Sequence, residues 1–121
     1  MIPKTVKKIG KKAFYNNKKL TTVTFKTKSK LEEIGDSAFQ GCKVMKKITI
    51  PSTHLTTIGK KVFYNCSKLN KIVVKSKKVT MVGQNAFKGV YKKAQIDVPN
   101  SKLGVYKSLF KKGQGKKVKI K

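Results

Sequence analysis

Residues 34–50 read IGDSAFQGCKVMKKITI, and the pattern returns at residues 58–74 as IGKKVFYNCSKLNKIVV. Two further copies are IGKKAFYNNKKLTTVTF at residues 9–25 and VGQNAFKGVYKKAQIDV at residues 82–98. The Ile/Val-Gly steps lie 25, 24 and 24 residues apart, and a phenylalanine follows each glycine by four positions. A fixed period of about 20 to 50 residues is the signature of stacked repeat architectures. The sequence therefore predicts four stacked copies of one structural unit.

Each copy predicts one short strand and one turn region. The copies end in apolar pairs separated by a single residue: Val23 and Phe25, Ile48 and Ile50, Ile72 and Val74, Ile96 and Val98. That alternation is typical of a strand with one buried face. The Gly-x-x-(Ala/Val)-Phe stretch predicts a turn or a single helical turn. A unit of this length cannot enclose a core alone, so we expect a repeat solenoid with parallel strands on its concave face and turns or single helical turns on the other side.

The predicted organisation is four repeats (2–25, 26–50, 51–74 and 75–98) followed by a C-terminal cap at residues 99–121. In this tail, Tyr106, Leu109 and Phe110 fit one face of a short helix, and Val118 with Ile120 fit a final strand. A terminal unit with an altered pattern and a charged surface is typical of a solenoid cap. Because the chain opens with the Ile-Pro pair that closes later strands, we expect a fragment of a longer repeat protein.

The charge balance is the second conspicuous feature. The 121 residues include 31 basic side chains, all of them lysine, against four acidic ones, for a net charge of +27. There is no arginine and no tryptophan. No apolar stretch approaches the roughly 20 residues of a membrane span, and the first residues lack the apolar core of a signal peptide.

The repeats resemble the BspA-type leucine-rich repeat, whose unit reads approximately IGxxAFxxCxxLxxIxIPxxV. The resemblance spans residues 2–98, and the lysine-rich tail is similar to the C-terminal ending of that family. It implies a leucine-rich-repeat solenoid in a secreted or surface-displayed bacterial protein, with adhesion to extracellular proteins among the known roles. Two alternatives stay open: a structural spacer, or the targeting module of a larger surface enzyme.

The lysines predict an anionic partner or serve only to solvate the surface. An extracellular protein with an acidic surface, an anionic glycan or cell-wall polymer, and nucleic acid are the classes that such a charge would attract. Sequence-specific nucleic-acid reading is disfavoured, because bidentate contacts to base edges favour arginine. We expect a monomer in which the uncovered end of the stack favours end-to-end association at high salt.

Strand alternation predicts where a partner binds. If the apolar residues of each strand point inward, the residues between them form two outward rows on the concave face. One row holds Thr22, Lys47, Lys71, Gln95 and Lys117, and its neighbour holds Thr24, Thr49, Val73, Asp97 and Lys119. Solenoids commonly bind partners along this face, so the rows form the candidate partner-binding surface.

The remaining reactive side chains predict no catalytic, cofactor or metal site. Cys42 and Cys66 occupy one repeat position about 5 Å apart in a stack, but parallel Cβ vectors disfavour a disulfide. We expect both to be free, buried thiols. His54 is expected in an exposed loop, with no second ligand at metal spacing. Glu32 and Glu33 point to opposite sides of an extended segment, so pairing with nearby lysines is expected, and the chain is interpreted as non-catalytic.

Overall fold

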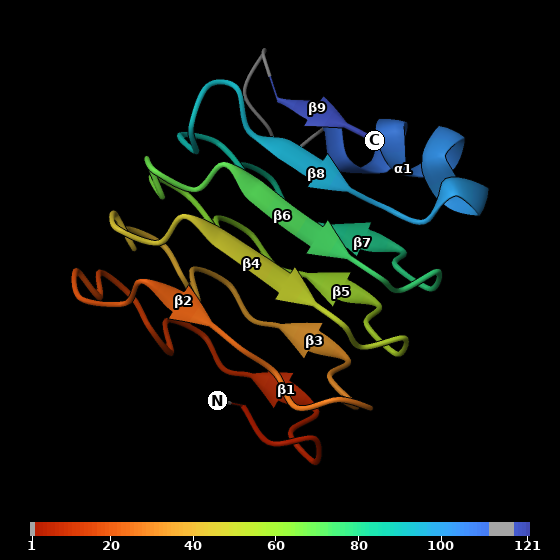
Figure 1. The fold of residues 1–121 in the computed structure, drawn as a ribbon, viewed down its shortest axis with the longest axis horizontal. Coiled ribbons are helices and arrows are strands. Elements are labelled where there is room, and N and C mark those ends of the chain that lie inside the picture. The colour runs from red at the N-terminus through yellow and green to blue at the C-terminus, as the bar shows by residue number, and fades with distance from the viewer. Residues whose placement is uncertain (1, 112–117) are drawn as a thin grey trace.

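The computed structural model describes residues 2–111 and 118–121 (Figure 1). The chain winds in successive coils, so that strands from neighbouring repeats lie side by side and the stack grows from the N-terminal to the C-terminal end. Two parallel sheets run along this stack, and a short helix lies at its C-terminal end. The predicted repeat solenoid is therefore confirmed.

The alternating segments form a five-stranded parallel sheet in the order β2-β4-β6-β8-β9. Its strands are β2 (Thr22–Val23), β4 (Lys47–Ile50), β6 (Lys71–Val74), β8 (Gln95–Asp97) and β9 (Lys119–Ile120). In β4, Ile48 and Ile50 are buried while Lys47 and Thr49 are exposed. The predicted sheet with one buried face is thus confirmed for its central strands.

A second parallel sheet, in the order β1-β3-β5-β7, was not predicted. Its strands are β1 (Lys8–Ile9), β3 (Glu33–Ile34), β5 (Thr57–Ile58) and β7 (Met81–Val82). They contain the Ile/Val of each Ile/Val-Gly step, and Ile34 and Ile58 are completely buried. Each strand has only two residues, which is too short for alternation to appear in the sequence.

The phenylalanine segments are turns and not helical turns. Each contains two residues with left-handed backbone, such as Ser37 at a φ of 59° and Gly41 at 76°, whereas a helix requires consecutive right-handed residues. Backbone hydrogen bonds join the turns of neighbouring repeats, for example from Phe39 N to the carbonyl oxygen of Val62 at 3.0 Å. The turns therefore form a third hydrogen-bonded ladder beside the two sheets.

A column of stacked phenylalanines runs through the core. Neighbouring ring centroids are 5.2, 5.6, 5.6 and 5.7 Å apart, with ring planes within 18° of parallel. The column consists of Phe14, Phe39, Phe63, Phe87 and Phe110. Four of these were predicted from the repeat, but Phe110 comes from the tail and extends the column beyond it.

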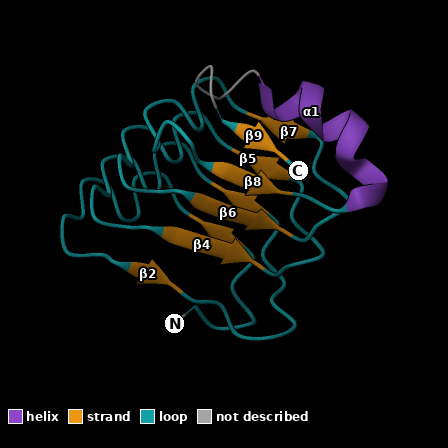
Figure 2. Ribbon diagram, turned by 45° about the horizontal axis from the view of Figure 1, so that its top comes forward, coloured by secondary structure: helices purple, strands orange, loops and turns teal. Residues whose placement is uncertain are grey.

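The tail folds over the end of the stack. A short 3-10 helix (Asn100–Lys102) leads into α1 (Leu103–Lys111), which contacts β7 and β9 (Figure 2). Tyr106 and Phe110 are buried and Leu109 is half-buried, so the predicted helix face is confirmed. The boundaries proposed for the four repeats and the cap remain predictions.

Candidate binding surface

The register of the five-stranded sheet defines the outward rows. Thr22 pairs with Lys47, Lys47 with Lys71 and Lys71 with Gln95. These four residues form the first row in the predicted order. In β6 and β8 the second row continues, because Val73 pairs with Asp97. The inward residues between the rows, Ile72 and Ile96, are completely buried.

The prediction for the last strand is wrong by two residues. Gln95 pairs with Lys119, so Lys119 belongs to the first row, where Lys117 was expected. Lys117 itself lies outside the described residues. A shift of two positions keeps the same side chains facing outward, because the period of a strand is two. Alternation therefore predicts the face of a strand correctly but does not determine its register.

Asp97 interrupts the basic character of this face. Its Oδ2 lies 3.7 Å from Nζ of Lys71, and its Oδ1 accepts a hydrogen bond of 2.8 Å from Nε2 of Gln95. Asp97 was expected in the second row, but this network, which joins both rows, was not predicted. The sequence does contain a signal for it, because Asp97 lies diagonally opposite Lys71 of the preceding repeat. The C-terminal half of the face thus carries a carboxylate.

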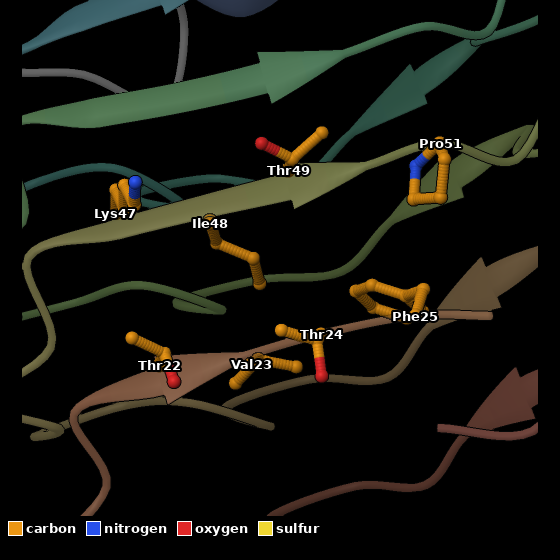
Figure 3. A pocket seen from close by; sticks show the side chains of 8 residues that line it. All are labelled: Thr22, Val23, Thr24, Phe25, Lys47, Ile48, Thr49 and Pro51. Atoms are coloured by element: carbon orange, nitrogen blue, oxygen red, sulfur yellow. The ribbon is translucent and has the colours of Figure 1, made fainter. Parts of the chain in front are cut away.

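The N-terminal half contains a groove between β2 and β4 (Figure 3). Its volume is about 320 Å³. Apolar groups come from Val23, Phe25, Ile48 and Pro51, and polar groups come from Thr22, Thr24, Lys47 and Thr49. In Figure 3, Ile48 reaches from β4 toward β2, while Phe25 and Pro51 lie at the end where the strands finish. All four polar residues belong to the predicted outward rows, but the groove itself was not predicted.

A second, smaller groove lies in the same sheet two repeats further on. It has a volume of about 230 Å³ and lies between the ends of β6 and β8. Its lining is Val73, Val74, Lys75, Asp97, Val98 and Pro99. Each groove therefore has a proline at the end of its second strand, but only the smaller one contains a carboxylate.

Cys42 and Cys66 are free and completely buried, as predicted. The thiol of Cys66 donates a hydrogen bond of 3.0 Å to the carbonyl oxygen of Phe39, and Cys42 bonds in the same way to Phe14. The neighbouring Cys42 and burial raise the pKa of the Cys66 thiol. Both side chains thus act as buried packing groups that tie one turn to the preceding turn.

The other three carboxylates lie away from the five-stranded sheet. Glu33 is in β3 and forms an ion pair of 3.1 Å with Lys8 of β1. Asp36 accepts a hydrogen bond of 2.8 Å from the backbone N–H of Lys60. Glu32 and His54 are exposed, His54 in a loop as predicted. Over residues 2–111 and 118–121, no group of three or more His, Cys, Asp or Glu side chains is arranged to hold a metal ion.

Comparison with known proteins identifies the class. The family described as "BspA type Leucine rich repeat region (6 copies)" matches residues 1–116. The chain is thus a leucine-rich repeat module, and it belongs to the BspA-type leucine-rich repeat family. No curated protein matches it.

A solved structure supports the same fold. The chain is similar to a leucine-rich repeat protein from Bacteroides ovatus, with 25% sequence identity and a TM-score of 0.77. The match covers 95% of this chain and 28% of that protein, so the chain spans less than a third of its length. In the described part of the chain, no helix combines the length and apolar character that crossing a membrane requires.

Proposed function

We propose that this chain is a non-catalytic binding module of a secreted or surface-displayed bacterial protein, and that it holds an anionic glycan or cell-wall polymer. The partner binds along the outer face of the five-stranded sheet. The observation that carries this proposal is the row of exposed polar and basic residues on that face: Thr22, Lys47, Lys71 and Lys119.

Charge and spacing support an extended anionic ligand. The net charge of +27 attracts polyanions over long distances. Lys47 and Lys71 are direct neighbours across parallel strands, which places their Cα atoms about 4.8 Å apart. Lysines at this spacing suit a ligand with closely repeated negative groups, which at Lys71 would compete with the Asp97 carboxylate. The compact ammonium of lysine acts as a point charge, which favours ion pairing over directional base recognition.

Surface location and adhesion are part of the same proposal. Membership in the BspA-type family supports a surface setting, and the similarity to a Bacteroides protein supports a bacterial one. Adhesion to an extracellular protein is a further role that the family suggests, and matrix proteins therefore belong in the binding test.

The test is a binding panel of sulfated glycan, wall teichoic acid, DNA and matrix proteins. Each is measured by isothermal titration calorimetry at physiological salt and again at about 0.5 M, where the Debye length falls to roughly 4 Å. We expect binding of an anionic glycan or wall polymer that persists, with reduced affinity, at the higher salt. If every polyanion binds equally well and this binding is lost at high salt, the lysines act only by non-specific charge attraction, which contradicts a specific site.

A pair of matched variants locates the surface. Lys47→Gln removes one positive charge from the proposed row. The matched control, Lys60→Gln, removes one positive charge from a turn that contains a phenylalanine of the column. The proposal expects a loss of affinity of about three- to five-fold for Lys47→Gln and a smaller loss for Lys60→Gln. Equal losses would contradict a site on the five-stranded sheet. Absence of binding to any partner would contradict the proposal and favour the spacer role.

A further inference from the structure

The two grooves described above occupy equivalent positions in different repeats of the five-stranded sheet. The inference drawn from them rests on the proposed function. We propose that the groove between β2 and β4 is the binding site for an anionic polysaccharide, and that Asp97 closes the equivalent groove between β6 and β8 to anions. The proposal thus selects a polysaccharide from among the anionic polymers and selects one of two related sites.

Two prolines explain why the grooves form where they do. After β6, the N–H of Lys75 donates to the carbonyl oxygen of Ile50 at 3.2 Å and continues the pairing of β4 with β6. Lys26 donates in the same way to Ile2 at 3.0 Å. Pro51 and Pro99 occupy the same repeat position but have no N–H to donate. The missing hydrogen bond leaves the ends of the neighbouring strands unjoined on one side of each proline.

The extent of pairing agrees with this explanation. β4 and β6 pair over four residues, whereas β2 and β4 pair only at Thr22 with Lys47 and Val23 with Ile48. Beyond Val23, Phe25 forms a bridge with Ile2 and not with the strand that ends in Pro51. The groove of about 320 Å³ extends from the paired residues of β2 and β4 to this unpaired end, where Thr24, Phe25, Thr49 and Pro51 line it. We therefore attribute the groove to the shortened backbone pairing between β2 and β4.

The lining of the first groove matches the chemistry of a sugar ring. A pyranose presents an apolar C–H face and an edge of hydroxyl and anionic groups. Pro51 and the parts of Val23 and Phe25 left uncovered by the core offer apolar surface to the ring face, and three threonine hydroxyls with the Lys47 ammonium offer donors to the edge. A phosphate polymer without sugar rings has no comparable apolar face. The lining therefore favours an anionic polysaccharide over a polyphosphate chain.

The second groove has the same origin but carries a carboxylate, Asp97, beside the lysine Lys75 in its lining. Asp97 stands at the repeat position of Thr49, and Gln95 stands at that of Lys47. The Asp97 carboxylate lines the groove, accepts the Gln95 hydrogen bond and lies 3.7 Å from the Lys71 ammonium. An approaching anion would meet the Asp97 carboxylate beside Lys75, while the Lys71 ammonium is already paired with that carboxylate. One residue thus decides which of two similar grooves accepts the ligand.

The experiment exchanges the deciding residues between the grooves. The probes are a heparin-derived tetrasaccharide and a linear polyphosphate of equal charge, titrated by calorimetry at about 0.15 M salt. Thr49→Asp should weaken tetrasaccharide binding about ten-fold, because a carboxylate then faces the anionic groups. Asp97→Thr should create a second tetrasaccharide site on each chain. Glu33→Gln is the matched control, since it also removes a carboxylate paired with a lysine of a neighbouring repeat, but from the other sheet.

The outcomes separate this inference from the proposed function. If wild-type protein binds the tetrasaccharide but Thr49→Asp binds it equally well, the groove assignment is overturned and polymer binding stands. The role proposed for Asp97 is overturned if Asp97→Thr increases tetrasaccharide binding no more than Glu33→Gln does. Tighter binding of polyphosphate than of tetrasaccharide overturns the choice of polysaccharide. Binding of neither probe overturns the groove assignment, while the proposed function falls only if the wider panel also shows no binding. Circular dichroism of each variant verifies that the substitutions leave the fold intact.

Discussion

The first and third repeats share the same motif, yet their side chains have different surroundings. Phe63 is completely buried between Phe39 and Phe87, whereas Phe14 is half-buried and, within residues 2–111 and 118–121, stacks on Phe39 alone. Leu69 is completely buried and its counterpart Leu20 is half-buried. The motif therefore supplies the apolar groups, but the neighbouring repeats provide most of the burial, as expected for a structure stabilised by nearest-neighbour interfaces.

The two ends of the stack differ in the same respect. At the C-terminal end, α1 places Phe110 on Phe87, with centroids 5.7 Å apart, and buries Tyr106 beside it. In the described residues, Phe14 has no such cover on its outer side. The helix thus provides the fourth repeat with the apolar contacts that a further repeat would supply.

The largest expected effect tests this difference directly. Phe63→Ala should lower the free energy of unfolding by about 3–5 kcal/mol, because it empties a site enclosed on both sides. Phe14→Ala should cost only about 1–2 kcal/mol, since the half-buried ring gives up less contact. Urea unfolding followed by circular dichroism measures both values. Equal losses would mean that the first repeat is as well buried in solution as the third.

A smaller effect concerns the glycines of the Ile-Gly steps. A Cβ added at Gly59 would lie 2.5 Å from Oδ1 and 2.8 Å from the backbone nitrogen of Asp36 in the preceding turn, whereas one added at Gly10 meets nothing within 4 Å. Gly59→Ala should therefore destabilise the protein by about 1–3 kcal/mol. Gly10→Ala should change stability by less than about 0.5 kcal/mol. A comparable loss for both variants in thermal unfolding would show that close stacking is not the reason for the glycine.

The covered end offers a third comparison. The Tyr106 hydroxyl donates to the carbonyl oxygen of Ser76 at 2.9 Å and accepts from the N–H of Val79 at 3.0 Å. In the preceding repeats, the serine hydroxyls fill a related role, as Ser52 does by donating to Leu31 at 2.7 Å. Tyr106→Phe leaves two buried backbone groups without partners and should cost about 1–2 kcal/mol in urea unfolding. An unchanged midpoint would mean that the hydroxyl is not needed to attach α1.

The smallest effect is a pH dependence of the same group. Burial raises the pKa of Tyr106, and the hydrogen bond from Val79 opposes this only in part. Because the folded state then holds the phenol proton more tightly than the unfolded state, its contribution is complete below the ordinary pKa of 10.0 and is lost as the pH rises above it. Wild-type stability should fall more steeply than that of Tyr106→Phe above pH 10. Parallel curves for the two proteins would contradict this assignment.

Much of the fold could be predicted because the repeat places equivalent residues in equivalent surroundings. The phenylalanine column, the buried faces of β4 and β6 and the buried thiols of Cys42 and Cys66 all follow from a period of 24 or 25 residues. The two-residue strands of the second sheet could not be predicted, because they are too short to show alternation. The candidate site was predicted as rows of outward residues, without the groove or the Asp97 network.

The sequence by itself determined the repeat unit, the strand faces and the positive charge of this protein, because these depend only on residue types and their spacing along the chain. Only the tertiary structure decided the register of β9, which pairs Lys119 with Gln95, since a two-residue shift leaves the alternation unchanged. It also decided that the strand pairing stops short at Pro51 and Pro99, beside the two grooves. The missing N–H of a proline opens a groove only where a particular carbonyl group of the neighbouring strand is left without its donor.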